Sequence, residues 1–296
     1  MRIGMIDVDG HNFPNIPLMK LSAWHKKQGD DVEWYNPFTD RFDRVYCSKV
    51  FSNTPDYDLV INADEVIRGG TGYDICGACL PDEIEHIYPD YSMYGIKDTA
   101  YGFLSRGCPR GCSFCIVGDK EGRRSRKVAN LEEFWRGQKK IVLCDPNILA
   151  CPDWNDLLGQ LAESKAKVDI NQGLDARLLT EAKIEALNRI KLESVHFAWD
   201  NYDDGDIILP KLEMYARLSK QKPHGHNAIV YVLCNYNTTI EQDIDRIYSL
   251  RNFGYWAYVM LYDKQTASRE HRRLQRWCNN RTIFAKCEKF EDYTSR

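Results

Sequence analysis

The sequence predicts an α/β protein in which a small parallel sheet is followed by a larger sheet curved into a partial barrel. Strand-like and helix-like segments alternate along most of the 296 residues. Most of the strand-like segments end in polar or reactive residues, as in α/β folds that bind ligands at the carboxyl ends of their strands. A chain of this length has room for two domains with buried cores.

The first 95 residues predict a small domain that begins with a βαβ unit. The expected elements are a strand over Arg2–Val8, a helix over Pro17–Lys27 that ends near Gly29, and strands over Asp31–Tyr35 and Leu59–Asn62. A glycine-rich turn at 69–72 and a connector at 80–100 follow. This order predicts a parallel sheet with its ligands at the carboxyl ends of the strands.

Residues 96–265 predict six βα units. The expected strands are Tyr101–Ser105, Lys140–Cys144, Lys167–Ile170, Ser194–Trp199, Ala228–Cys234 and Trp256–Leu261. The expected helices are Leu131–Lys139, Trp154–Ser164, Glu181–Arg189, Ile207–Gln221 and Ile240–Asn252. Six units are fewer than the eight of a complete barrel, so a partial barrel is expected. Residues 266–296 form a C-terminal extension.

Composition points to a cytoplasmic protein with reduced thiols. The net charge of −3 gives no overall attraction to nucleic acid. No apolar run approaches the roughly 18 residues of a membrane span, and the N-terminus lacks the pattern of a signal peptide. Eleven cysteines in a reducing compartment indicate metal or cluster ligation better than disulfides.

Three of these cysteines carry the expected chemistry. Cys108, Cys112 and Cys115 follow the first strand of the second region at C-x3-C-x2-C spacing. Thiolates are the preferred ligands of iron-sulfur clusters, and three of them on one loop can hold three irons of a four-iron cluster. The fourth iron is then open to a small molecule. Gly107 and Gly111 allow the backbone to wrap closely around the cluster.

A structural zinc site is the alternative interpretation of this motif. Zinc is normally held by four protein ligands in a closed tetrahedron. No fourth Cys or His follows Cys115 at short range, but Cys144 or Cys151 is available to fold back.

The cysteine loop resembles the signature of the radical S-adenosylmethionine (SAM) superfamily. The resemblance rests on Ser105 to Cys115, including Phe114 before the third cysteine. The sequence before Cys108 is similar to a subgroup in which a cobalamin-binding domain comes first. The resemblance covers about residues 101–265. It implies a Rossmann-like, cobalamin-binding-like domain at 1–95 followed by a partial (β/α)6 TIM barrel of radical SAM type.

The resemblance also implies a reaction. A 4Fe-4S cluster on Cys108, Cys112 and Cys115 binds SAM at its open iron and, when reduced, cleaves it to a 5′-deoxyadenosyl radical that modifies a substrate. The resemblance implies an electron donor such as flavodoxin or ferredoxin. The sequence does not identify the substrate. A zinc or iron-sulfur protein without turnover is the non-enzyme alternative.

Polar residues after the later strands are candidates for contacts to SAM. Where superfamily members often have Gly-Gly-Glu, this chain departs from the pattern with residues 143–147, and Asp145 is left to accept from the SAM ammonium. Arg177 suits a carboxylate, and Asp200 suits the ribose hydroxyls. The alternative for each candidate is a turn or helix-capping role. The full candidate set is Phe114, Asp145, Gln172, Asp175, Arg177, Asp200 and Asn235.

The first domain has two candidate cofactors, cobalamin and an auxiliary iron-sulfur cluster. Asp9 and His11 fit part of a cobalamin motif, but Pro14 replaces its last glycine. Cobalamin, which implies radical methyl transfer, is one alternative, and a domain serving as a substrate lid or docking surface is the other. Methylthiotransferases of this superfamily carry an auxiliary cluster on three N-terminal cysteines, and candidates for that set here are Cys47, Cys76 and Cys79. Cys278 and Cys287 have no spacing that assigns them a role.

Two basic segments are the remaining features. The run Arg123–Lys127 predicts a solvated segment, with contact to a phosphate-bearing substrate as the alternative. The C-terminal segment either packs as a final helix or contacts nucleic acid. It carries Arg272, Arg273, Arg276, Trp277 and Arg281.

Overall fold

The structure is a computed structural model that describes residues 1–39, 41–77 and 79–294. The chain divides into two compact units, Met1–Val142 and Leu143–Arg296. The domain boundaries near residues 95 and 265 stay predictions. No helix in the described ranges combines the length and apolar character needed to cross a bilayer.

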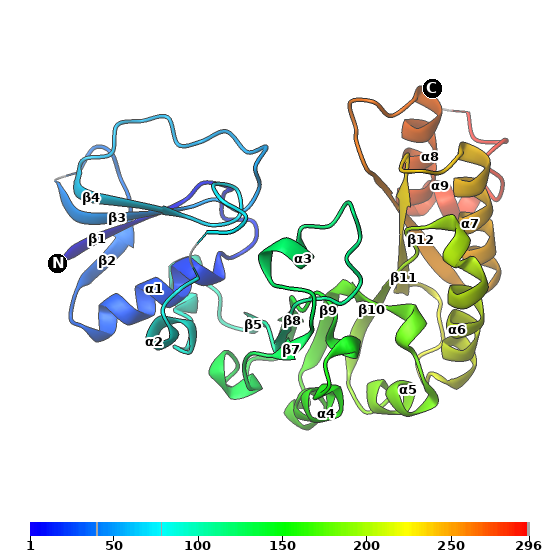
Figure 1. Ribbon diagram of the computed structural model, residues 1–296, viewed down its shortest axis with the longest axis horizontal. Helices are drawn as coiled ribbons and strands as arrows, with labels where there is room; N and C mark the ends of the chain where they lie inside the picture. Colours follow the sequence, from blue (N-terminus) through cyan, green and yellow to red (C-terminus); the bar gives the residue numbers. More distant parts are fainter. Residues whose placement is uncertain (40, 78, 295–296) are drawn as a thin grey trace. The chain divides into compact units, whose positions relative to one another are not determined.

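A four-stranded parallel sheet forms the start of the first unit (Figure 1). Its strands lie in the order β2-β1-β3-β4, and all three pairings are parallel. The strands are β1 (Arg2–Asp7), β2 (Asp31–Trp34), β3 (Phe42–Ser48) and β4 (Ala63–Gly69). Since β1 and β3 are neighbours while the chain runs from β1 to β2, the strand order reverses between them. In open α/β sheets ligands bind at such a reversal.

Helix α1 (Ile16–Lys27) connects β1 to β2 and confirms the predicted helix at 17–27. The Asn15 side chain caps its first turn by accepting the Leu18 N–H at 3.2 Å. Proline in the first turn and three basic residues in the last suit the helix ends. Gly29, with φ of +85°, follows in the left-handed conformation that ends many helices.

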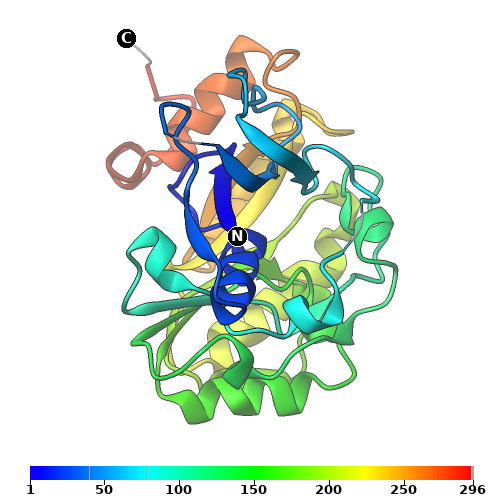
Figure 2. The same ribbon diagram turned by 90° about the vertical axis from the view of Figure 1, so that its left-hand side faces the viewer.

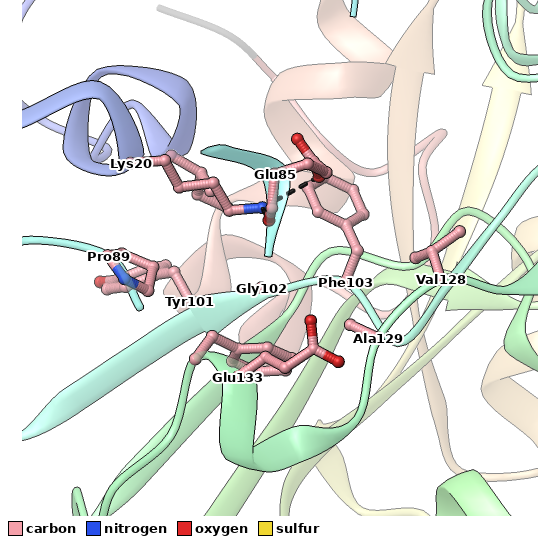
Figure 3. Close-up of a pocket in the computed structure, with 11 residues that line it drawn as sticks. Lys20, Glu85, Pro89, Tyr101, Gly102, Phe103, Val128, Ala129 and Glu133 are labelled. Carbon is pink, nitrogen blue, oxygen red and sulfur yellow. Dashed lines mark hydrogen bonds and ion pairs between the residues drawn. The ribbon is translucent and has the colours of Figure 1, made fainter. Parts of the chain in front are cut away.

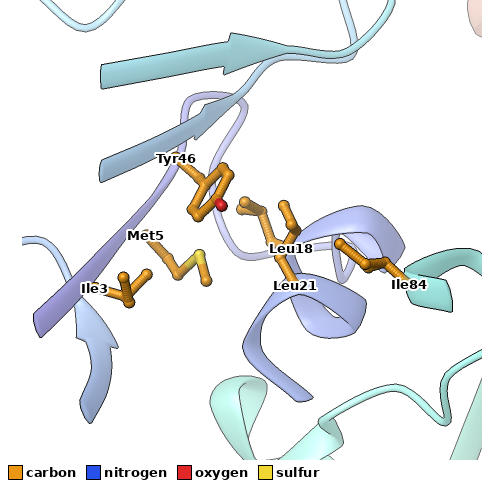
Figure 4. Packing of buried hydrophobic residues seen from close by; sticks show 6 residues of the cluster. All are labelled: Ile3, Met5, Leu18, Leu21, Tyr46 and Ile84. Carbon is orange, nitrogen blue, oxygen red and sulfur yellow. The ribbon is translucent and has the colours of Figure 1, made fainter. Parts of the chain in front are cut away.

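Both faces of the first sheet are covered, but by different parts of the chain. On one face α1 packs against the strands (Figures 1 and 2), and Ile3 and Met5 of β1 meet Leu18 and Leu21 (Figure 4). On the other face Ile6 packs against β3 and is covered by loop residues. Two buried faces explain the nearly unbroken apolar run of β1.

The predicted strand at Leu59–Asn62 is wrong. The structure gives these residues no strand, and Val60 is 89% exposed. The chain instead forms β3 and β4, which the sequence analysis missed. β4 lies at the edge of the sheet, where charged residues are tolerated. There Glu65 sits opposite Arg44 in the register and accepts from its guanidinium at 2.7 Å.

Residues between the two sheets form the predicted connector, which contains the short helix α2 (Asp82–Glu85). The predicted strand at 101–105 is divided in two, β5 (Thr99–Gly102) and β6 (Ser105–Arg106). The helix predicted over Leu131–Lys139 is wrong, since only a 3-10 turn at Leu131–Glu133 forms. Gly137 adopts φ of +93°, which a continuing α-helix does not allow.

The second sheet contains six strands in the order β12-β11-β10-β9-β8-β5. The pairs β9–β10, β10–β11 and β11–β12 are parallel. The strands after β5 are β8 (Lys140–Leu143), β9 (Lys167–Leu174), β10 (Leu192–Ala198), β11 (Gly225–Cys234) and β12 (Tyr255–Leu261). Strands therefore form at all six predicted positions, and consecutive ones are neighbours. The protein is a mixed α/β chain with parallel sheets, while the Rossmann-like and partial-barrel assignments stay predictions.

Helices alternate with the strands of the second unit, as predicted (Figure 1). They are α4 (Trp154–Ser164), α5 (Glu181–Leu187), α6 (Gly205–Leu218) and α7 (Ile240–Asn252), and each contacts the next in chain order. One set of alternating strand residues is buried in the hydrophobic core of the unit. This set includes Val168, Ile170, Val195, Phe197, Val230, Val232, Ala257 and Val259.

The C-terminal extension packs as helices α8 (Arg269–Asn279) and α9 (Arg281–Lys286). Trp277 is fully buried, which favours the packing interpretation of this basic segment over the nucleic-acid one. Helix α8 also covers the free edge of β12: the Asn279 side chain accepts the Val259 N–H at 2.8 Å and donates to its carbonyl at 3.0 Å. A covered edge cannot pair with another chain.

We expect the substitution Arg246→Ala to lower the free energy of unfolding of the second unit by about 3–5 kcal/mol. Arg246 and Asp243 on α7 form an ion pair with no exposed surface on either side chain. The substitution leaves the Asp243 carboxylate buried without its main counter-charge. Urea unfolding followed by circular dichroism measures the loss. The control is Arg217→Ala, at an exposed position on α6, and an equally small loss in both variants would contradict the prediction.

Candidate functional site

The three cysteines of the motif lie on one hairpin loop of the first unit. The hairpin is formed by β6, defined above, and β7 (Arg126–Lys127), which pair in antiparallel register. The loop between them, residues 107–125, is called the cysteine loop below. It contains Cys108, Cys112 and Cys115, followed by the short helix α3 (Val117–Lys120).

The ends of the cysteine loop are held by backbone contacts that require glycine. Gly107 adopts φ of +87°, and a Cβ there would lie 2.1 Å from the Arg124 carbonyl oxygen. The Cys108 N–H donates to the Gly122 carbonyl at 3.2 Å. Further along, the Cys115 N–H donates to the Cys112 carbonyl at 3.0 Å, so a tight turn joins the last two cysteines.

The chemistry of this donor set fits an iron-sulfur cluster. All eleven cysteines lie in the described part of the chain, and none forms a disulfide. Cys115 is exposed, while Cys108 and Cys112 are half-buried, as is Phe114, which directly precedes Cys115. Within the described residues, however, no group of three or more His, Cys, Asp or Glu side chains is arranged to hold a metal ion. The thiols share a loop but are not gathered into ligand geometry.

Part of the basic run at 123–127 packs against the cysteine loop, which the sequence analysis did not foresee. A Cβ on Gly111 would lie 2.9 Å from Nη1 of Arg123, so that guanidinium lies directly beside the residue before Cys112. Arg126 donates to the Glu121 carbonyl at 2.8 Å. These two arginines help to hold the loop in shape. Contact of the run with a substrate stays a prediction.

Two predicted SAM contacts form an ion pair after β9. Asp175 accepts from the Arg177 backbone N–H at 3.2 Å and from its Nε at 2.8 Å. Arg177 also donates to Asp204 at 2.7 Å. Its guanidinium thus binds two carboxylates of the chain itself. The structure therefore gives Asp175 the capping role that was the alternative for it.

Asp200, which follows β10, lies within electrostatic range of this ion pair. Burial raises the pKa of its carboxyl, although the charges of Arg246 and Arg177 act in the opposite direction. Nearby positive charges thus offset only part of the cost of removing this carboxyl from water. Such a carboxyl is a candidate for binding a hydrogen-bond donor of a ligand. Asp200 is therefore the candidate that the electrostatics of the second unit favour.

The other strand-end candidates differ in environment. Asn235, with φ of +61°, donates from Nδ2 to the Asp263 carbonyl at 3.3 Å and thus joins the ends of β11 and β12. This contact supports the turn role that was its alternative. Gln172 is exposed and donates to Asn171 at 3.3 Å. Asp145 is 1% exposed, directly after β8.

A polar network within the strands of the second unit was missed by the sequence analysis. Ser194 Oγ lies 3.3 Å from Asp169 Oδ1 and 3.0 Å from His196 Nε2. The other ring nitrogen, Nδ1, is 2.5 Å from the Tyr231 hydroxyl, which donates to the Asn171 carbonyl at 2.9 Å. The polar candidates predicted in the second unit all follow the ends of strands. The polar–apolar alternation at 168–171 and 194–197 was the pattern that could have revealed it.

The charge of His196 determines how many hydrogen bonds of this network can form at the same time. If Tyr231 donates to Asn171, His196 Nδ1–H must donate to Tyr231, and a neutral ring then accepts the Ser194 proton at Nε2. Ser194 has no second proton for Asp169. All four bonds form together only with the imidazolium, whereas burial lowers the pKa of His196.

The first unit gives its candidates structural roles. Asp9 accepts from the Thr54 hydroxyl at 2.6 Å and from the Phe51 N–H at 3.3 Å, so it holds the loop after β3. His11 stacks on Trp34 with ring centroids 4.2 Å apart. Cys47 packs among apolar residues of β1 and β3, and burial raises its pKa to about 11. A neutral buried thiol favours packing over an auxiliary cluster, while bound cobalamin stays a prediction.

A cavity of about 20 Å³ lies beside the cysteine hairpin (Figure 3). It has room for a water molecule but not for a substrate. Lys20 of α1 and Glu85 of α2 form an ion pair at its wall, with Nζ 2.9 Å from Oε1. Gly102 forms another part of the wall, where a Cβ would overlap the ring of Phe134.

We expect the ring of His196 to titrate below the ordinary histidine value of about 6.5. Burial disfavours the imidazolium, so the unfolded chain takes up this proton at a higher pH than the folded one. The contribution of neutral His196 to the stability of the folded chain is therefore complete above about pH 6.5. It is lost as the pH falls through the lower pKa that His196 has in the folded chain. NMR of ring-labelled histidine measures the titration, with His196→Gln for assignment. A midpoint at or above about 6.5 would contradict the prediction.

Comparison with known proteins gives a partial similarity. No family model matches the chain. A CDK5RAP1-like protein of Oryza sativa subsp. japonica is 35% identical over 83 residues, which is 25% of this chain and 14% of that protein. The chain thus matches a small part of this curated relative, whose name is one from the radical SAM methylthiotransferase family. The similarity agrees, at this coarse level, with the resemblance of the cysteine motif.

Proposed function

We propose that this chain is a radical SAM enzyme whose cluster ligands are Cys108, Cys112 and Cys115. The observation that carries the proposal is the position of the three thiols: all lie at C-x3-C-x2-C spacing on one hairpin loop between β6 and β7. The loop precedes a series of strands that form a parallel sheet and that alternate with helices along the chain. The partial similarity to the CDK5RAP1-like protein supports the same class.

The residues of the loop bind and orient the cofactor in this proposal. The bound 4Fe-4S cluster would supply an open iron for SAM and one electron for its cleavage. The three thiolates hold the cluster, and Gly107 lets the chain turn sharply before the first of them. Phe114, half-buried between two of the ligands, limits the access of water to the site.

Among the strand-end candidates of the second unit, we propose Asp145, Gln172 and Asp200 as contacts to SAM. Asp175, Arg177 and Asn235 already hold the turns after their strands through the bonds described above. Asp145 is assigned to the SAM ammonium. Asp200 is assigned to the ribose hydroxyls, since a half-buried carboxyl that has lost part of its hydration gains from a donor that replaces the lost water.

The proposal includes an external electron donor such as flavodoxin or ferredoxin, and it leaves the substrate open. A methylthiotransferase-like reaction is the second candidate, because the name of the partial relative favours it. The burial of Cys47 counts against a three-cysteine auxiliary site in the first unit. A cobalamin-dependent methyl transfer is supported by sequence resemblance alone, and the two residues of the partial motif, Asp9 and His11, make structural contacts in the first unit.

Anaerobic reconstitution with iron and sulfide should give about four iron atoms per chain. Reduction in the presence of SAM should then yield 5′-deoxyadenosine. We expect Cys112→Ala to lose the product, because a cluster with two protein ligands is held poorly. The control is Cys287→Ser, which removes a half-buried thiol at the end of α9 and should retain both properties. Zinc in place of iron, or no iron at all, would overturn the proposal.

A further inference from the structure

We propose that Glu121 is a positioning residue that holds the backbone of Cys108 for cluster binding. The inference rests on the proposed function of the cysteine loop. Glu121 follows α3, six residues after the last cysteine, and its side chain is 9% exposed. It folds back to the opposite end of the loop, where the chain enters from β6.

The two carboxylate oxygens of Glu121 bind two different donors at this entry. Oε1 accepts from Nη1 of Arg106 at 2.9 Å, and Oε2 accepts from the Gly107 N–H at 3.0 Å. The next residue, Cys108, donates its own N–H to the Gly122 carbonyl. Consecutive amides at positions 107 and 108 are therefore held by consecutive residues at 121 and 122.

The carboxylate also offsets a repulsion within the hairpin. Arg106 and Arg126 are directly opposite each other in the β6–β7 register, where like charges destabilise the pairing. Arg106 donates to the side chain of Glu121, and Arg126 donates to its carbonyl. Glu121 thus binds both guanidinium groups, Arg106 through its carboxylate and Arg126 through its backbone carbonyl. Substitution of the side chain removes only the contact to Arg106 and leaves the one to Arg126.

Arg106 connects this contact to helices α1 and α2 of the first unit. Its guanidinium lies 3.9 Å from the centre of the Phe103 ring, and its Nη2 is 3.9 Å from Oε1 of Glu85. Glu85 in turn pairs with Lys20 of α1. Charges alternate along this series, from Lys20 to Glu85, Arg106 and Glu121. Arg106 is therefore held between two carboxylates and an aromatic ring, and it is an ordered partner for Glu121.

The two acceptor oxygens of a carboxylate explain why a glutamate is needed at position 121. A carboxylate presents two acceptor oxygens, whereas an amide presents one oxygen and one NH2 group. In Glu121→Gln one of the donors, Arg106 or Gly107, would face another donor. Residues that orient metal ligands through such bonds commonly change metal affinity about 10- to 100-fold when substituted.

Two measurements test the proposal on the full-length chain. In the metal-free protein, hydrogen exchange followed by mass spectrometry should show faster exchange at residues 105–108 in Glu121→Gln. In the reconstituted protein, iron should be lost to a chelator about 10-fold faster than from the wild type. Glu121→Asp, which retains both oxygens, should recover part of the retention.

The matched control is Glu133→Gln. Glu133 also contacts two donors through its carboxylate: it accepts the Asn130 N–H at 2.7 Å and lies 2.7 Å from Nδ1 of His86. It lies in the same unit but outside the cysteine loop. Iron loss at the wild-type rate in this variant, with circular dichroism unchanged in both, supports a local role for Glu121.

The outcomes separate this proposal from the proposed function. Unchanged exchange at residues 105–108, or faster exchange with wild-type iron retention, would overturn the role of Glu121 while leaving a radical SAM enzyme intact. Equal iron loss in the two Gln variants would show a general loss of stability and would also overturn it. A wild-type chain that binds no iron would overturn the proposed function and this role with it.

Discussion

The second unit depends on one buried ion pair. Arg246 on α7 has no exposed side-chain surface, and Asp243 balances its charge at 2.5 Å. Moving a guanidinium out of water costs free energy unless other acceptors replace its hydration. Here the carbonyls of Trp199, Asp200 and Leu233 do so, at 2.6, 3.1 and 2.8 Å. Because these carbonyls lie in or just after β10 and β11, the pair fixes the turns that follow both strands.

The cysteine loop is held by the same kind of bonding in a more exposed place. In each case one charged side chain reaches back to polar backbone groups that secondary structure leaves without partners. Arg246 supplies donors to carbonyls after strands, and Glu121 supplies acceptors to an amide before a thiol. Charged hydrogen bonds are shorter and stronger than neutral ones. A small number of them is therefore enough to hold an irregular segment.

The sequence predicted the parts of the fold where periodicity and burial agree. Helices α4 and α7 begin and end where predicted, because their apolar faces repeat at helical spacing. β3 and β4 were missed, since charged residues such as Arg44 and Glu65 pair across the strands and hide the alternation. The run at 59–62 looked like a strand by hydrophobicity alone, but register and pairing are non-local properties.

For the candidate site, polarity at a strand end was only half of the information. It predicted positions at the carboxyl ends of the strands but could not separate residues that hold a turn from candidates for binding a ligand. Arg177 and Asn235 use their polar groups to bind other parts of the chain, whereas Asp200 is half-buried and the pKa of its carboxyl is raised. Both kinds of residue are polar, follow a strand and precede a helix. The difference lies in the bonds that each side chain makes after folding, and those bonds depend on residues distant in the sequence.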